Sequence, residues 1–105
     1  MPAIHLIKND PHLPQITPIK PGNDIYRSGY WVIANATAQA LVGGNIYFHE
    51  HRASPSFYGG IIMDAEMVEE GEYAGRVVFT FRRDPASIGV TTPHEGWAQE
   101  MKIIQ

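Results

Sequence analysis

Cysteine is missing from all 105 residues of this sequence. A chain without thiols has no disulfide framework, no thiolate nucleophile and no thiolate metal site. Long apolar runs are missing too, since none approaches the roughly 18 residues that a membrane-spanning helix requires. The N-terminus lacks the basic flank and apolar region of a secretory signal. We therefore expect a cytoplasmic protein that does not associate with membranes.

Positive charge is also scarce. The chain has 8 Lys and Arg residues against 11 Asp and Glu residues, which gives a net charge of −3 at pH 7. Strong binding to phosphate backbones needs several basic contacts, so this balance argues against non-specific nucleic-acid binding. Five of the acidic residues fall within residues 64–72, and the remainder of the chain is slightly basic. One surface can therefore be mildly basic while the 64–72 segment repels phosphate.

The common catalytic motifs are absent as well. The sequence has no Gly-x-Ser-x-Gly motif, no phosphate-binding loop and no dinucleotide fingerprint. Acid–base catalysis would need a carboxylate or histidine held in a cleft with a perturbed pKa. Glu50 falls on the same side of its predicted strand as Ile46 and Phe48, but we expect it at the strand end, in solvent. We therefore expect a binding module rather than an enzyme, with no cofactor.

What the sequence does contain is typical of one globular domain spanning residues 1–105, with 44% hydrophobic and 18% charged residues. Residues 9–24 carry four prolines, each of which fixes φ and removes a backbone donor. They predict an extended arm or long loop, with at most a short edge strand around 15–19.

Short apolar or alternating segments predict most of the remaining structure as strands. These segments are residues 3–8, 29–34, 45–52, 58–67, 76–83 and 97–104. Residues 35–42 predict one short helix, with Asn35 or Thr37 as its N-cap and Gly43-Gly44 as its C-terminal stop. Residues 69–75 predict a turn and 84–96 a second long loop, while Gly59-Gly60 indicates a bulge or a close backbone approach. We expect a mainly β (α+β) fold, a small, mostly antiparallel pseudo-barrel of five or six strands, because closing a sheet protects its edges.

Aromatic and polar residues at the strand starts and in the central loop suggest a ligand site. Tyr30, Trp31 and Tyr58 could stack on nucleic-acid bases, an interaction worth about 1–3 kcal/mol per base. Arg52, Ser54 and Ser56 could meet a phosphate or a base edge. We expect the 52–58 loop to form a recognition surface that faces Tyr30 and Trp31.

The order of segments around this loop resembles the PUA-like superfamily, particularly its EVE and ASCH branches, over about residues 26–104. The resemblance rests on the Tyr30-Trp31-Val32-Ile33 strand, a short helix, Gly43-Gly44, the next strand, and Tyr58-Gly59-Gly60-Ile61-Ile62-Met63-Asp64. It implies a pseudo-barrel that binds RNA, DNA or a modified nucleotide, with a base extruded into an aromatic pocket. Carried over to this chain, Tyr30 and Trp31 would lie near the mouth of that pocket, and Ser54, Ser56 and Tyr58 on the facing loop.

An alternative interpretation is a metal site. His49 and His51 share one face of a predicted strand, and two imidazoles so placed can bind a metal. Their spacing after Gly43 resembles the opening of the cupin motif, in which a glutamate follows the second histidine by four or five positions. Pro55 and Ser56 occupy those positions here, so a third ligand would have to come from His94.

A third interpretation is a structural or interaction protein. In this case the proline-rich arm at 9–24 would contact a partner, including a second copy of the chain in a homo-oligomer.

Overall fold

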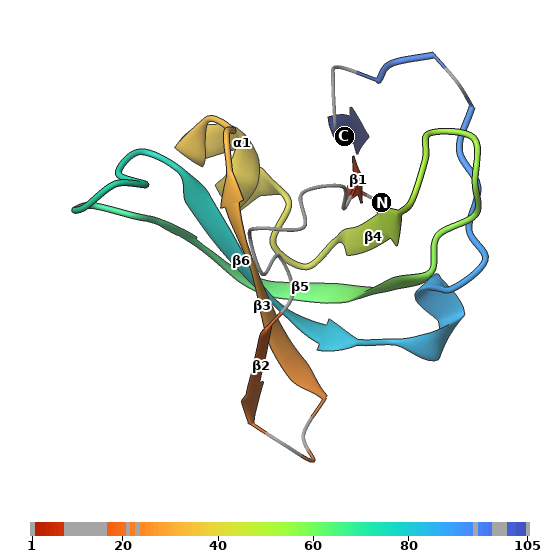
Figure 1. Ribbon diagram of the computed structural model, residues 1–105, viewed down its shortest axis with the longest axis horizontal. Coiled ribbons are helices and arrows are strands. Elements are labelled where there is room, and N and C mark those ends of the chain that lie inside the picture. The colour runs from red at the N-terminus through yellow and green to blue at the C-terminus, as the bar shows by residue number, and fades with distance from the viewer. Residues whose placement is uncertain are drawn as a thin grey trace.

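The computed structural model describes residues 2–7, 17–20, 22, 24–93, 95–97 and 101–104. Within these residues seven strands form one mixed sheet, in the order β2-β3-β6-β5-β4-β1-β7 (Figure 1). The strands are β1 Ala3–Ile7, β2 Thr17–Lys20, β3 Ile25–Trp31, β4 Asn45–His49, β5 Tyr58–Met67, β6 Val77–Arg83 and β7 Met101–Ile104. The helices are α1 Asn35–Ala40 and a single 3-10 turn, η1 Pro85–Ser87.

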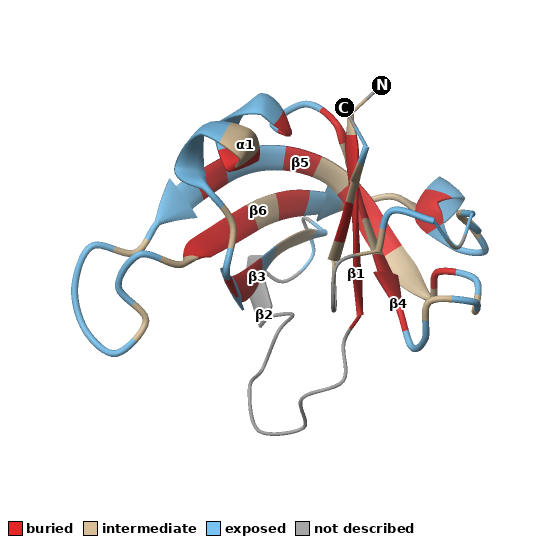
Figure 2. Cartoon of the chain, turned by 90° about the horizontal axis from the view of Figure 1, so that it is seen from above, coloured by how far each residue is buried: buried red, intermediate tan, exposed pale blue. Residues whose placement is uncertain are grey.

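The predicted β-rich fold, mostly antiparallel and with one short α-helix, is confirmed. Five of the strand pairings are antiparallel, and only β1 and β4 run parallel. β2 is the strand that raises the number beyond the five or six predicted, and it pairs with β3 at the edge of the sheet. The sheet is strongly curled, and no ladder joins its edge strands β2 and β7 within the described part of the chain (Figures 1 and 2).

Strand boundaries differ from the prediction where long-range pairing decides them. β5 has the predicted bounds, but β3 begins at Ile25, four residues earlier than expected, because its first half pairs with β6 and β2. β4 ends at His49 rather than at residue 52, because the chain turns there. Trp97 lies outside a strand, and residues 98–100 lie outside the described part of the predicted last strand.

The helix is where it was predicted, but its N-cap is not. Ala34 occupies the cap position with extended backbone angles, and no side chain accepts a hydrogen bond from the first helical N–H groups. Asn35 is already helical, so its side chain points along the helix and accepts from Gln39 Nε2 at 3.4 Å. The predicted glycine stop is confirmed, since Gly43 has a φ of +89° shortly after the helix ends.

The hydrophobic core lies inside the curl of the sheet, under α1. It contains Ile4 and Leu6 from β1, Ile46 and Phe48 from β4, and Val77, Phe79 and Phe81 from β6, together with Trp31, Ala38, Leu41, Ile62 and Ala65. Figure 2 shows these buried positions running along β5, β6, β1 and β4. The opposite face of β1, β4 and β7, called here the outer face, is also covered, and buries His5, His49 and Lys102.

The glycine pair in β5 confirms the predicted close backbone approach. A Cβ on Gly59 would overlap the Ile46 carbonyl oxygen of β4, and one on Gly60 would overlap the Arg82 carbonyl oxygen of β6. The register of β5 shifts a few residues later, between Ile62 and Asp64. Glycine therefore lets both neighbouring strands approach β5 at this point.

Candidate functional site

The six residues predicted to share one site lie at two ends of the sheet. Trp31 is opposite Val77, which is opposite Met67 at the end of β5. Tyr58 is at the start of β5, opposite Phe48. Nine residues of strand separate the two ends, which is about 30 Å at 3.3 Å per residue. The predicted recognition surface, in which the 52–58 loop faces Tyr30 and Trp31, is therefore wrong.

The serines of this loop hold the loop itself together. Ser54 Oγ donates to the His51 carbonyl and accepts from the His51 N–H, both at 2.9 Å. Ser56 is buried, and its Oγ donates to the Ser87 carbonyl at 2.5 Å and accepts from the Val90 N–H at 2.9 Å. The Ser54 hydroxyl thus closes the β4–β5 loop on itself, and the Ser56 hydroxyl connects the loop to the segment that follows β6.

The other two residues at this end are also packed against protein groups. The Arg52 guanidinium lies 6.0 Å from the centre of the Trp97 ring. Tyr58 is half-buried, with its ring edge-on to Tyr26 at 5.6 Å and to Phe81 at 6.1 Å. Burial raises the pKa of the Tyr58 phenol well above its usual range, and its hydrogen bond with Tyr26 raises it further. Tyr58 is therefore a neutral packing residue at physiological pH.

Tyr30 and Trp31 point to opposite sides of the sheet. Trp31 is only 4% exposed in the core, where its Nε1 donates to Ser28 Oγ at 3.0 Å. Tyr30 is 39% exposed. Its ring is stacked on Tyr73 at 4.3 Å between centroids and 5° between planes, and the Arg76 guanidinium covers Tyr73 at 5.5 Å. Tyr30 is therefore held rigidly while part of its ring stays accessible.

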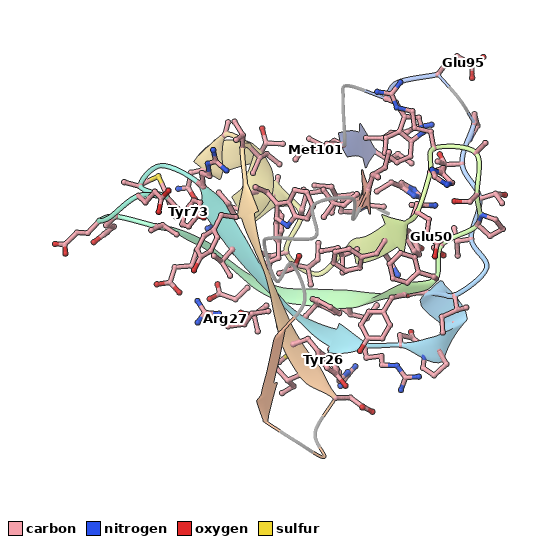
Figure 3. All side chains as sticks on the ribbon, viewed as in Figure 1. Tyr26, Arg27, Glu50, Tyr73, Glu95 and Met101 are labelled. Carbon is pink, nitrogen blue, oxygen red and sulfur yellow. The ribbon has the colours of Figure 1, made fainter. Side chains whose placement is uncertain are left out.

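Tyr30 lines an open hollow of about 750 Å³, called here the Tyr30 groove. The groove lies between α1, β3, the end of β5 and the start of β6, and is lined by Arg27, Tyr30, Asn35, Gln39, Ala65, Glu66, Met67, Val68, Glu69, Glu70 and Val78. Figure 3 shows Arg27 and Tyr73 on one side of the molecule and Glu50, in the β4–β5 loop, on the other.

Two amide side chains give the groove its neutral polar groups. Asn35 and Gln39 lie one turn apart on α1, a spacing that puts both on one face of the helix and could have been read from the sequence. Gln39 Nε2 donates to the Ala65 carbonyl at 2.5 Å, which fixes the side chain across the groove wall. Three glutamates and one arginine give the lining a net charge of −2.

A second cluster lies on the outer face, around a hydrogen bond between two buried histidines. His49 Nδ1 is 2.8 Å from the Ser54 carbonyl oxygen, which can only accept, so Nδ1 carries the proton. The bare Nε2 of neutral His49 then accepts from His5 Nδ1, also at 2.8 Å. His5 is left with its lone pair on Nε2, and no described residue donates to that atom.

This arrangement differs from the metal site considered above. His49 uses both ring nitrogens on protein partners, His51 is exposed in the loop, and His94 lies outside the described residues. Within the described part of the chain, no three His, Cys, Asp or Glu side chains come together as a metal site. The sequence pattern missed His5, which is 44 residues from its partner.

The histidine pair lies in an apolar and positively charged setting. His5 is 2% exposed, stacks on Tyr47 at 4.7 Å, and has the edge of Trp97 at 6.3 Å. Burial, and to a lesser extent repulsion from His49 and Lys102, lowers the pKa of His5 to about 4. Lys102 donates to the Pro93 carbonyl at 2.7 Å. His5 is therefore neutral at pH 7.

No protein-family model matches the chain, and neither curated proteins nor solved structures show a significant similarity to it. None of the described helices has the length and apolar character needed to cross a membrane.

Proposed function

We propose that this chain is a non-catalytic binding module that takes a nucleobase, free or as part of a modified nucleotide, RNA or DNA, into the Tyr30 groove. The observation that carries the proposal is the partly exposed Tyr30 ring on the wall of a hollow of about 750 Å³. Ligand sites of this size are typically concave, with an apolar or aromatic wall and a few polar groups. The order of segments that resembles PUA-like domains favours the same class of ligand.

The groove chemistry suits the base better than the phosphate. A tyrosine ring stacks on any base, and Asn35 Nδ2 and Gln39 Oε1 offer a donor and an acceptor to a base edge, whereas Gln39 Nε2 already donates to Ala65 and Asn35. Glu66, Glu69 and Glu70 repel a phosphate. The ligand we propose is thus a neutral or cationic base whose phosphates point out to solvent.

The stack behind Tyr30 supports this role. Tyr73 covers part of Tyr30 and is itself not among the groove residues, so Tyr30 turns a different part of its ring toward the hollow. A ring that is already ordered loses little conformational entropy when a ligand stacks on it.

The proposal is tested by titrating a panel of nucleosides, including N-methylated bases, and short single-stranded oligonucleotides against the protein at low salt. Tyr30→Ala should weaken binding by about 5- to 150-fold, which corresponds to the roughly 1–3 kcal/mol of one stacked base. Tyr30→Phe keeps the ring and should keep most of the affinity.

Ser54→Ala is the matched control, because Ser54 lies in the loop at the far end of β5. It should leave binding unchanged. If Ser54→Ala weakens binding and Tyr30→Ala does not, the site is at the loop end instead. If the wild-type protein binds no member of the panel, the nucleobase proposal fails.

The metal alternative has no comparable support, because His49 has no free ring nitrogen. Most of the arm at 9–24, the basis of the proposed homo-oligomer, lies outside the described residues. Assembly through it therefore stays a prediction, which the elution volume of the purified protein checks.

A further inference from the structure

The histidine pair lies where two separate segments cover the outer face. One is the β4–β5 loop, which His49 holds through the Ser54 carbonyl. The other is the segment before β7, from which Trp97 places its ring against both His5, at 6.3 Å, and His49, at 5.8 Å. The pair is thus the common contact of both covering segments.

For this contact to persist, His49 must be neutral and His5 must carry a proton on Nδ1. The Ser54 carbonyl requires a proton on His49 Nδ1, and the bond to His5 requires a lone pair on His49 Nε2. The proton that His5 donates to His49 is on His5 Nδ1. The bare Nε2 of His5 is therefore the atom that takes up the first additional proton.

We propose that the His5–His49 pair is a proton-operated latch: acid releases the β4–β5 loop and the segment carrying Trp97 from the outer face, while the core on the other face stays folded.

The first proton places a charge where the surroundings disfavour it. The groups that face His5 are His49 and Tyr47 from β4, Lys102 from β7, and Trp97 from the covering segment, with the Arg52 guanidinium stacked on Trp97. None of these described groups is a carboxylate, and Lys102 is a cation. A buried imidazolium among them lacks a counter-charge, so opening to water is favoured.

The second proton breaks the bond itself. Once His49 Nε2 is protonated, two N–H donors face each other across 2.8 Å. The first proton therefore acts through its unbalanced buried charge, although it leaves the bond from His5 Nδ1 in place, and the second proton acts by removing the acceptor of that bond.

The sign of the pH dependence follows from linkage. The pKa of His5 is about 4 in the closed form, against 6.5 for an exposed histidine. In the closed form both segments cover the outer face. The stability of this form relative to the open form is full above pH 6.5 and is lost as the pH falls toward 4. The ratio of open to closed molecules should rise by about 80-fold between pH 6.5 and 4 and approach about 300-fold below pH 4, which is tenfold for each unit of the pKa difference.

The core does not depend on this pair. Ile4, Leu6, Ile46 and Phe48 come from the same two strands but point to the other face, and all four are fully buried. Each tryptophan reports on one face of the sheet. Trp31 is in the core, where its Nε1 donates to Ser28 Oγ, whereas Trp97 lies against the histidine pair on the outer face and its Nε1 has no partner among the described residues.

The experiment is a pH titration of the full chain by nitrogen–proton NMR, following both indole N–H signals and the His5 ring nitrogens. We expect the Trp97 signal to move between pH 6.5 and 4, in step with the titration of His5, while the Trp31 signal stays in place. At pH 7, the His5 nitrogens should show the tautomer protonated on Nδ1.

Two variants complete the test. His5→Gln offers His49 an amide donor that does not titrate, so the Trp97 response should shrink or vanish. His51→Gln removes an exposed histidine from the same loop and should leave the response unchanged.

The proposal is overturned if Trp97 does not respond down to pH 4, or if His5→Gln responds like the wild type. It is also overturned if Trp31 and Trp97 change together, since that is global acid unfolding. Should His5→Gln fail to fold, the wild-type titration decides alone: a Trp97 transition that does not follow the His5 ring nitrogens excludes the latch.

Discussion

Replacing Gly60 by alanine tests how closely the central strands pack. The added Cβ would overlap the Arg82 carbonyl oxygen, a backbone atom that cannot rotate away, so β5 and β6 must separate locally. Overpacking of this kind costs typically 1–3 kcal/mol. For Gly60→Ala we expect a loss of about 2 kcal/mol in the free energy of unfolding, or about 8–16 °C in Tm, since 1 kcal/mol shifts a domain of this size by about 4–8 °C.

The assay is thermal and urea denaturation beside a second glycine variant, Gly71→Ala. Gly71 lies in the exposed turn before β6 with a φ of +92°, and nothing lies within 4 Å of an added Cβ. That substitution carries only the strain of a left-handed residue, about 1 kcal/mol. If Gly60→Ala is no more destabilising than Gly71→Ala, the close approach of β5 and β6 at this point does not exist.

Two further substitutions test the core and the loop contacts. Phe48→Ala should lower the free energy of unfolding, measured in urea, by about 3–5 kcal/mol, because it removes a fully buried ring. Val32 is 74% exposed, so Val32→Ala should change this free energy by less than about 0.5 kcal/mol. Ser56→Ala should cost about 1–3 kcal/mol, because it leaves the Ser87 carbonyl and the Val90 N–H without their partner; a loss no larger than that of Ser54→Ala would show that this buried contact contributes nothing.

The sequence predicts those strands whose own pattern carries the information. Val77, Phe79 and Phe81 recur with period two, and all three are buried on the core side. β5 also has its predicted bounds. The start of β3 could not be found in this way, because Ile25 to Ser28 follow a segment rich in Pro and Gly and become a strand by pairing with β6.

The candidate site was harder to predict. Alternation in a strand indicates on which face of the sheet a side chain lies, but it does not indicate near which end of the sheet the residue lies. Tyr30 and Tyr58 lie near the ends of β3 and β5, which both pair with β6, but the register of these pairings places the two residues far apart. His5 was missed because all five residues of β1 are buried, so this strand has no polar face to indicate a site. Its partner is determined by the parallel pairing with β4, which no local pattern reveals.

The position of β1 between β4 and β7 also bears on how the chain folds. β5 and β6 are neighbours in sequence and can pair early, whereas β1 must wait for β4, some 40 residues later, and β7 joins only after residues 101–104 have been synthesised. Sheets with such distant pairings fold slowly, since loop closure comes before any gain from contact. Until β4 is available, β1 is an apolar segment with both edges unpaired, and such an edge can pair with another chain and lead to aggregation.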